Sequence, residues 1–166
     1  TRTLWVNSTP EFDRELCERY QDTWEQARRG ELDLWMQTGE GCLALVIILD
    51  QFPLNMFRDS AHSFVSEAQS RDVAAAAIEK GFDKLLPVEQ RSFLYMPYMH
   101  SEKLEDQQLA LKLFDQPDLE SNLRFAHHHH AIIEKYGRFP HRNAALGRTS
   151  SDAEIEYLNS KEAFTG

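Results

Sequence analysis

Histidine and arginine side chains, which suit proton transfer and anion binding, are concentrated between His127 and Asn143 of this 166-residue chain. Five of its seven histidines lie in this stretch. In the wider window 122–149, five basic residues stand against one acidic residue, a local charge of +4 in a chain whose formal net charge is −9. Imidazole exchanges protons near neutral pH, and guanidinium binds carboxylate or phosphate through paired hydrogen bonds. Helices do not need such a cluster to fold, so the pattern indicates a functional site.

The four consecutive histidines 127–130 cannot bind one metal ion together, because adjacent side chains on a helix point about 100° apart. His129 has apolar residues three and four positions away in both directions, so it is predicted to point inward. An inward histidine is either a hydrogen-bonded core residue or a catalytic one. A metal site would require His129 and distant ligands, for example His100, His141, Asp50 or Glu102. Since the short His-x-x-x-His and Glu-x-x-His spacings are missing, no metal is predicted.

The segment Gly137–Asn143 leaves a helix through a glycine and a proline and carries Arg138, His141 and Arg142. Such a loop can hold side chains toward a cleft, where two arginines, a histidine and an asparagine suit the binding of a carboxylate or phosphate. The alternative is that the two arginines cap helix carbonyls and pair with Asp50 or Glu102, holding the helices together.

Asp50 is unusual because it follows seven apolar residues at the negative end of a predicted helix. A carboxylate there is unfavourable unless a cation or a hydrogen-bond donor meets it. It is either bonded to neighbouring backbone or buried facing the basic cluster.

Apolar spacing and cap residues predict helices joined by short connections. The predicted ranges are 10–29, 41–51, 60–80, 87–97, 102–117, 118–136 and 151–160, with a connector at 55–58. The stretch 43–49 is apolar nearly all round, which makes its helix central. Pro53 and Pro97 are expected to end their helices, and Ser101 to cap the next one. The sequence therefore predicts one all-α domain over 1–166, an antiparallel array of helix hairpins.

The composition narrows the class of protein. With 42% hydrophobic and 27% charged residues, the chain is typical of a soluble globular protein. Its acidic balance argues against nucleic acid as a partner. No apolar run reaches the roughly twenty residues of a membrane span, and the opening Thr1–Trp5 does not resemble a signal peptide. Two cysteines, Cys17 and Cys42, are expected to be buried free thiols, so a cytoplasmic location is predicted.

Together these residues resemble a bacterial family known as domain of unknown function 924, whose members share a tetratricopeptide-like helical fold. The resemblance rests on motifs that cover nearly the whole chain: 43–53 with Asn55, 93–97 with His100-Ser101-Glu102 and Gln107, 129–143 and 146–148. The chain departs from the family pattern at Leu54, where an arginine is usual, and at Glu67, where an aspartate is usual. The resemblance implies the fold and no established activity.

Two functions are predicted. In the first, a polar pocket binds a small anionic ligand and can act catalytically. Its candidate catalytic residues are His129, His100, His141, Asp50 and Glu102. Its candidate ligand-binding residues are Arg138, Arg142, Asn143, Arg148, Gln51, Asn55 and Arg58. In the second, the chain is a tetratricopeptide-like module that binds a protein partner, and these polar residues are structural. The sequence has no phosphate loop, dinucleotide fingerprint or nucleophile motif, so it identifies neither a reaction nor a cofactor.

Overall fold

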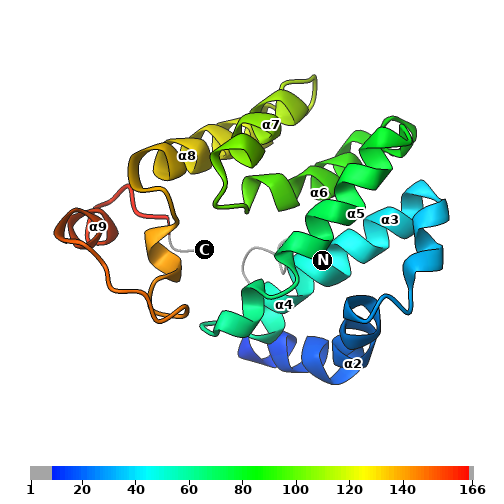
Figure 1. Ribbon diagram of the computed structural model, residues 1–166, viewed down its shortest axis with the longest axis horizontal. Helices are drawn as coiled ribbons and strands as arrows, with labels where there is room; N and C mark the ends of the chain where they lie inside the picture. Colours follow the sequence, from blue (N-terminus) through cyan, green and yellow to red (C-terminus); the bar gives the residue numbers. More distant parts are fainter. Residues whose placement is uncertain (1–8, 165–166) are drawn as a thin grey trace.

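Helices make up the fold, which we describe from a computed structural model covering residues 9–164 (Figure 1). The prediction about the opening residues, that they are no signal peptide, lies outside this range. The α-helices are α2 (Pro10–Arg28), α3 (Gly39–Val46), α4 (Phe52–Met56), α5 (Glu67–Glu79), α6 (Val88–Met99), α7 (Leu104–Phe114), α8 (Glu120–Tyr136) and α9 (Asp152–Leu158). The shorter turns are η1 (Asp33–Gln37), η2 (Ile47–Gln51), η3 (Ala61–Phe64), η4 (Phe82–Leu85) and η5 (Pro140–Arg142). No strand occurs among the described residues, so the predicted all-α class is confirmed.

Consecutive helices pack on one another where the connectors are short. α6 packs on α7 and α7 on α8, while α3 lies against both α5 and α6. Figure 1 shows α7 and α8 along one edge of the fold, α2 along the opposite edge, and α9 apart on the far side of α8. None of the helices within 9–164 is both long enough and apolar enough to span a membrane.

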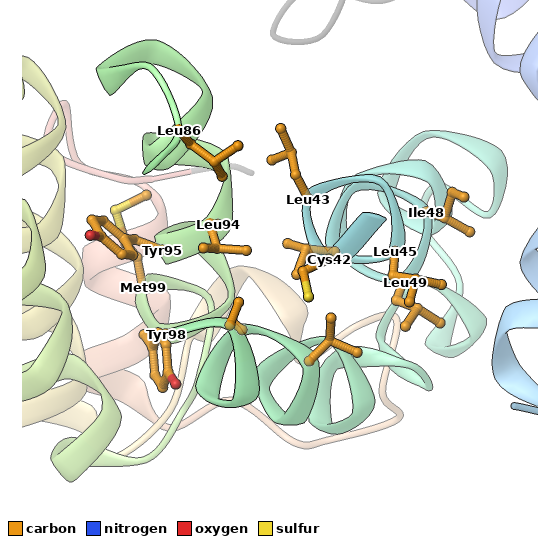
Figure 2. Packing of buried hydrophobic residues seen from close by; sticks show 14 of the residues in the cluster. Cys42, Leu43, Leu45, Ile48, Leu49, Leu86, Leu94, Tyr95, Tyr98 and Met99 are labelled. Carbon is orange, nitrogen blue, oxygen red and sulfur yellow. The ribbon is translucent and has the colours of Figure 1, made fainter. Parts of the chain in front are cut away.

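The main core forms where α3 and η2 pack against α5 and α6 (Figure 2). Leu45, Leu49 and Leu94 are each at most 1% exposed. Cys42 is a buried free thiol as predicted, whereas Cys17 is only partly buried. A second, smaller cluster of Ile132, Ile133 and Phe139 forms between α8 and η5. The residues with candidate chemistry lie between these two clusters and around the smaller one.

Several predicted helix ends were wrong. The range 60–80 is divided, because η3 precedes α5 and the α-helix itself begins at Glu67. Ser101 does not cap α7, which begins at Leu104; its hydroxyl instead accepts from the Lys103 amide and donates to Asp106. α8 begins at Glu120 because Asp118 adopts a left-handed φ of 68°.

Pro97 does not end α6, which continues to Met99. A proline inside a helix costs about 3 kcal/mol. The next two residues, Tyr98 and Met99, are only 5% and 6% exposed. Burying two such side chains contributes about 1.5–3 kcal/mol each, which offsets the lost helical hydrogen bond.

Pro53 does not end the central helix either. Residues 47–51 form a π-turn in which the Phe52 amide donates to the Ile47 carbonyl, five residues back, and α4 continues to Met56. The connector predicted at 55–58 therefore begins only after Met56, because Asn55 and Met56 belong to α4. Pro53 has no N–H to offer the Leu49 carbonyl, four residues back. That carbonyl accepts the Ser66 hydroxyl instead, at 2.6 Å.

Ser66 also links this turn to α2. Its Oγ, which donates to the Leu49 carbonyl, accepts a hydrogen bond from Trp24 Nε1 at 3.1 Å. Both Ser66 and Trp24 are 1% exposed, so water cannot replace either bond. One hydroxyl thus satisfies two buried polar groups from different helices.

Ser66→Ala is expected to lower the free energy of unfolding by about 2–6 kcal/mol, because each of the two buried groups left unsatisfied costs about 1–3 kcal/mol. Urea unfolding followed by circular dichroism measures this. Ser92→Ala is the control: Ser92 is 4% exposed, but its hydroxyl bonds only to the Glu89 carbonyl of its own helix. Equal losses in the two variants would contradict the role assigned to Ser66.

Candidate functional site

Asp50 and His100 form a buried pair at the centre of the predicted site. His100 Nδ1 lies 3.1 Å and 3.0 Å from the two carboxylate oxygens of Asp50. Asp50 is 2% exposed, and Gln51 Nε2 also donates to its Oδ2 at 2.5 Å. Of the two alternatives that the sequence left open for Asp50, a buried carboxylate agrees with the structure, but its partners are a histidine and a glutamine side chain and not the basic cluster.

The two members of the pair come from helix irregularities. Asp50 lies in the π-turn. His100 is the C-cap residue that directly follows α6, three positions after the internal Pro97. Burial alone would lower the pKa of His100, but the charge and hydrogen bond of Asp50 raise that pKa above its usual value. Since Nδ1 faces Asp50, Nε2 is the ring nitrogen that can meet a ligand. A carboxylate that orients and charges an imidazole in this way makes it a better proton acceptor.

Arg142 lies next to this pair. Its Nη2 donates to the carbonyl oxygen of His100 at 2.9 Å, and its Nη1 lies 3.0 Å from Glu67 Oε1. Its guanidinium carbon lies 4.5 Å and 4.8 Å from the ring centroids of Phe64 and Phe139. The residue is 6% exposed, and its Nε is buried without a hydrogen-bond partner. Arg142 is therefore held firmly while one donor remains unused.

Glu67 is the acidic partner of Arg142, and the sequence pointed to it only as a departure from the family pattern. Burial raises its pKa more than the charge of Arg142 lowers it, and Asp50 raises it further. The raised pKa favours the uncharged form of Glu67, and this form does not balance the charge of Arg142. Neither Asp50 nor Glu102 pairs with Arg142, so that predicted alternative was wrong in its partners.

Arg148 binds Glu102 and is fully engaged. Nη1 and Nη2 donate to the two Glu102 oxygens at 2.7 Å and 2.9 Å, and Nε donates to Asn143 Oδ1 at 2.9 Å. Nη2 also donates to the Phe139 carbonyl at 3.0 Å. Burial alone would raise the pKa of Glu102, but Arg148 and the Phe139 amide lower it. These contacts fix the loop between α8 and α9 onto the turn after α6.

Arg138 is likewise engaged, with Glu154 of α9. Its Nε and Nη2 donate to the two Glu154 oxygens at 2.6 Å and 2.8 Å, and Nη2 also donates to the Thr149 carbonyl. The bonds from Arg138 lower the pKa of Glu154 to about 2. The sequence missed Glu154 as a partner, although the Ser151–Glu154 spacing is that of a capping box, which the structure contains.

His129 and His141 differ from His100 in their surroundings. His129 is 3% exposed, as its spacing predicted, and its Nδ1 donates to the Phe125 carbonyl at 2.8 Å. Burial lowers its pKa to about 3. His141 Nδ1 is buried without a hydrogen-bond partner, and burial lowers the pKa of this ring to about 4. Both rings are therefore neutral at physiological pH.

Of the remaining residues predicted to bind a ligand, some lie beside the Asp50–His100 pair and others face α2. Gln51 and Asn143 are buried beside the site, where Asn143 also bonds Ser150. Asn55 donates to the Gln51 carbonyl and accepts from Arg58, whose Nε donates to Asp13 of α2 at 3.1 Å. Arg58 is half-exposed and faces α2, so it is not brought to the His100 cluster.

Metal binding finds no support in residues 9–164, where no three His, Cys, Asp or Glu side chains are grouped as ligands of one ion. Two hollows of about 320 Å³ and 400 Å³ lie elsewhere, beside Trp24 and beside Leu119. The structure thus brings together Asp50, His100, Arg142 and Glu67, with His129 and His141 adjoining them, and it engages Arg138 and Arg148 in ion pairs.

Comparisons with known proteins agree with this fold. The family model described as bacterial protein of unknown function (DUF924) matches residues 1–162. A solved structure of a protein of unknown function from Agrobacterium tumefaciens is similar with a TM-score of 0.89 and 39% sequence identity. The match covers 93% of this chain and 88% of that chain. No curated protein with significant similarity is found.

Asp50→Asn is expected to lower the pKa of His100, because burial still disfavours the imidazolium while the carboxylate that favours it is lost. A pH titration of the histidine ring signals by NMR measures this. His129 and His141 are internal controls, since their pKa values of about 3 and about 4 arise mainly from burial and should change little.

The same change alters the pH dependence of stability. Because the folded-state pKa of His100 is above its ordinary 6.5, the stabilisation by the Asp50–His100 pair is complete below that pH. It is lost as pH rises through the folded-state pKa. The parent's advantage in unfolding free energy over Asp50→Asn should therefore shrink with rising pH. An advantage that grows with pH would contradict the assignment.

Arg148→Lys is expected to lower the free energy of unfolding by about 1.5–3 kcal/mol, because lysine keeps the charge but cannot reproduce the paired bonds to Glu102. Urea unfolding measures this. Arg19→Lys is the control: Arg19 and Glu15 form an exposed pair, each 60% exposed, so no measurable change is expected there. If Arg148→Lys were as stable as the parent, Arg148 would be free to serve a ligand.

Proposed function

The chain belongs to the bacterial family of proteins of unknown function DUF924, and from the geometry of its site we propose that it binds a small anionic ligand at Arg142 and His100. In this proposal His100 exchanges a proton with the ligand through Nε2, while Asp50 orients the ring and stabilises its protonated form. The carrying observation is the buried Asp50–His100 pair with Arg142 bonded to the same histidine's carbonyl.

Arg142 is the cation best suited to the ligand. Arg138 and Arg148 each spend two donors on one carboxylate, in paired bonds that leave little for a ligand. Arg142 has an unused buried Nε–H. A buried donor without a partner costs free energy that an incoming carboxylate or phosphate oxygen would recover. The guanidinium lies between two aromatic rings, which fixes its plane before the ligand arrives.

Glu67 supports the same proposal by its pKa. Since burial raises that pKa, Glu67 can take up a proton when an anion approaches, and the charge of Arg142 then serves the ligand. The pKa of His100 is raised as well, which favours its imidazolium form. Both shifts make the cluster more positive when an anion binds.

The alternative, a module that binds a protein partner, finds its best support in the ion pairs of Arg138 and Arg148. In that case the polar residues of the loop after α8 hold α9 and the α6–α7 turn together, and their loss reduces stability alone. The two functions differ in one respect: the first requires Arg142 and His100 to respond to an anion.

Inorganic phosphate is a suitable probe, measured by isothermal titration calorimetry. Arg142→Lys should weaken phosphate binding about tenfold or more, because lysine cannot supply fixed donors in one plane. Arg138→Lys is the matched control from the same loop, and it should bind as the parent does. Circular dichroism of each variant verifies folding. Phosphate should also raise the pKa of His100 in the parent, since a nearby anion favours imidazolium.

The proposal would be wrong if phosphate bound Arg142→Lys and the parent equally, or if it left the His100 titration unchanged. Loss of stability in Arg142→Lys with no binding to the folded parent would favour the protein-interaction function.

A further inference from the structure

Phe164, on the segment that follows α9, packs against the small cluster of Ile132, Ile133 and Phe139 and also lies against three histidine rings. Its ring centroid is 4.5 Å from that of His129, 5.1 Å from that of His141 and 6.2 Å from that of His128, each in an edge-on arrangement. The rings of His129 and His141 also contact the Phe139 ring, with centroid distances of 5.4 Å and 5.6 Å. These rings form an aromatic seat, defined here as His128, His129, His141 and Phe139, that holds one phenyl group.

We propose that the aromatic seat is a binding site for the ring of a small aromatic ligand, and that Phe164 occupies it as an internal competitor. The inference rests on the proposed function in one respect: the ligand that it describes carries both the ring and the anion bound at Arg142.

The covering segment is attached weakly. Within residues 9–164, the backbone hydrogen bonds of Glu162, Ala163 and Phe164 go to Ser160 and Tyr157, within or just after α9. Phe164 itself is only partly buried. Its side chain is therefore the main contact of this segment with the seat, and a second ring of similar size can compete with it.

Phe164 also offers no hydrogen-bond partner to the histidine rings that it contacts. His141 Nδ1 is buried without a partner, and a phenyl ring has no group to offer it. His129 donates from Nδ1 to a carbonyl, so its Nε2 carries a lone pair that a phenyl ring does not use either. A ligand that joined an aromatic ring to a hydroxyl or another small polar group would fit the seat better than Phe164 does.

Phe139 joins the seat to the anion site. Its ring contacts His129 and His141 and also lies 4.8 Å from the guanidinium carbon of Arg142. The Phe139 side chain therefore lies both beside the position proposed for the ligand's ring and beside the Arg142 guanidinium that would bind its anionic group. The chemical class that matches both is a small aromatic acid or aryl phosphate.

The test uses NMR of the histidine rings with two probes, benzyl alcohol for the ring and inorganic phosphate for the anion. Phe164→Ala should bind benzyl alcohol about tenfold more tightly than the parent, because the internal competitor is removed. The ring signals of His129 and His141 should shift with it. Phe125→Ala is the matched control, since Phe125 is on α8 and is 54% exposed. It should bind benzyl alcohol as the parent does.

The outcomes separate this inference from the proposed function. Benzyl alcohol that binds Phe164→Ala no more tightly than the parent overturns the aromatic seat, whatever phosphate does. Phosphate that fails to bind while benzyl alcohol gains affinity supports the seat and overturns only the anion site. The urea concentration at the midpoint of unfolding is measured for Phe164→Ala and for the parent. Equal midpoints show that binding is compared between two folded proteins. If the variant does not fold, Phe164→Leu, which keeps apolar bulk without the ring, should show the same gain in a smaller degree, and no gain there overturns the seat.

Discussion

The structure depends on how the central helix passes Pro53. A helix that reached a proline without adjustment would leave the Leu49 carbonyl unpaired in a dry core. The π-turn at Ile47–Gln51 and the Ser66 hydroxyl solve this together, and the solution fixes α2, α3 and the start of α5 relative to one another. It also places Asp50 in the interior. A buried carboxylate needs donors, and the fold supplies Gln51 from the same turn and His100 from the end of α6. The chemical centre of the molecule thus follows from a backbone requirement.

The positive charge of the His/Arg stretch is largely balanced within the fold. Glu102 and Glu154 take up Arg148 and Arg138, and Glu67 lies against Arg142. Two of these three acids lie outside the window 122–149 on its N-terminal side and one on its C-terminal side. A charged window in the sequence therefore marks where ion pairs form between distant segments. Of these three arginines, Arg142 is the one whose buried Nε has no hydrogen-bond partner and whose partner carboxyl has a raised pKa.

Periodicity predicted those features that depend on a residue's own helix. His129 points inward because its neighbours at three and four residues are apolar, and the stretch 43–49 is central for the same reason. The proline predictions failed because tertiary burial of Tyr98 and Met99, and a hydroxyl seventeen residues away from Leu49, outweigh a local rule. Periodicity could not predict which residues far apart in the sequence form pairs. Asp50 and His100 are separated by 50 positions, and Arg142 and Glu67 by 75. The tetratricopeptide likeness and the single-domain boundary stay predictions.

The three candidate catalytic histidines have different protonation behaviour, and this difference argues for different roles. Burial opposes the charged form of His100, but Asp50 raises its pKa above the ordinary value and so favours the imidazolium. Burial without a carboxylate drives the pKa of His129 and His141 to about 3 and about 4, so those rings stay neutral and offer lone pairs and flat surfaces. A neutral imidazole is compatible with a phenyl ring against its edge, as Phe164 demonstrates, whereas a charged one would lose its hydration there. The arrangement thus places one histidine with a raised pKa beside two neutral histidines that suit contact with an apolar ring, and Phe139 is the member of the aromatic seat that also contacts the Arg142 guanidinium.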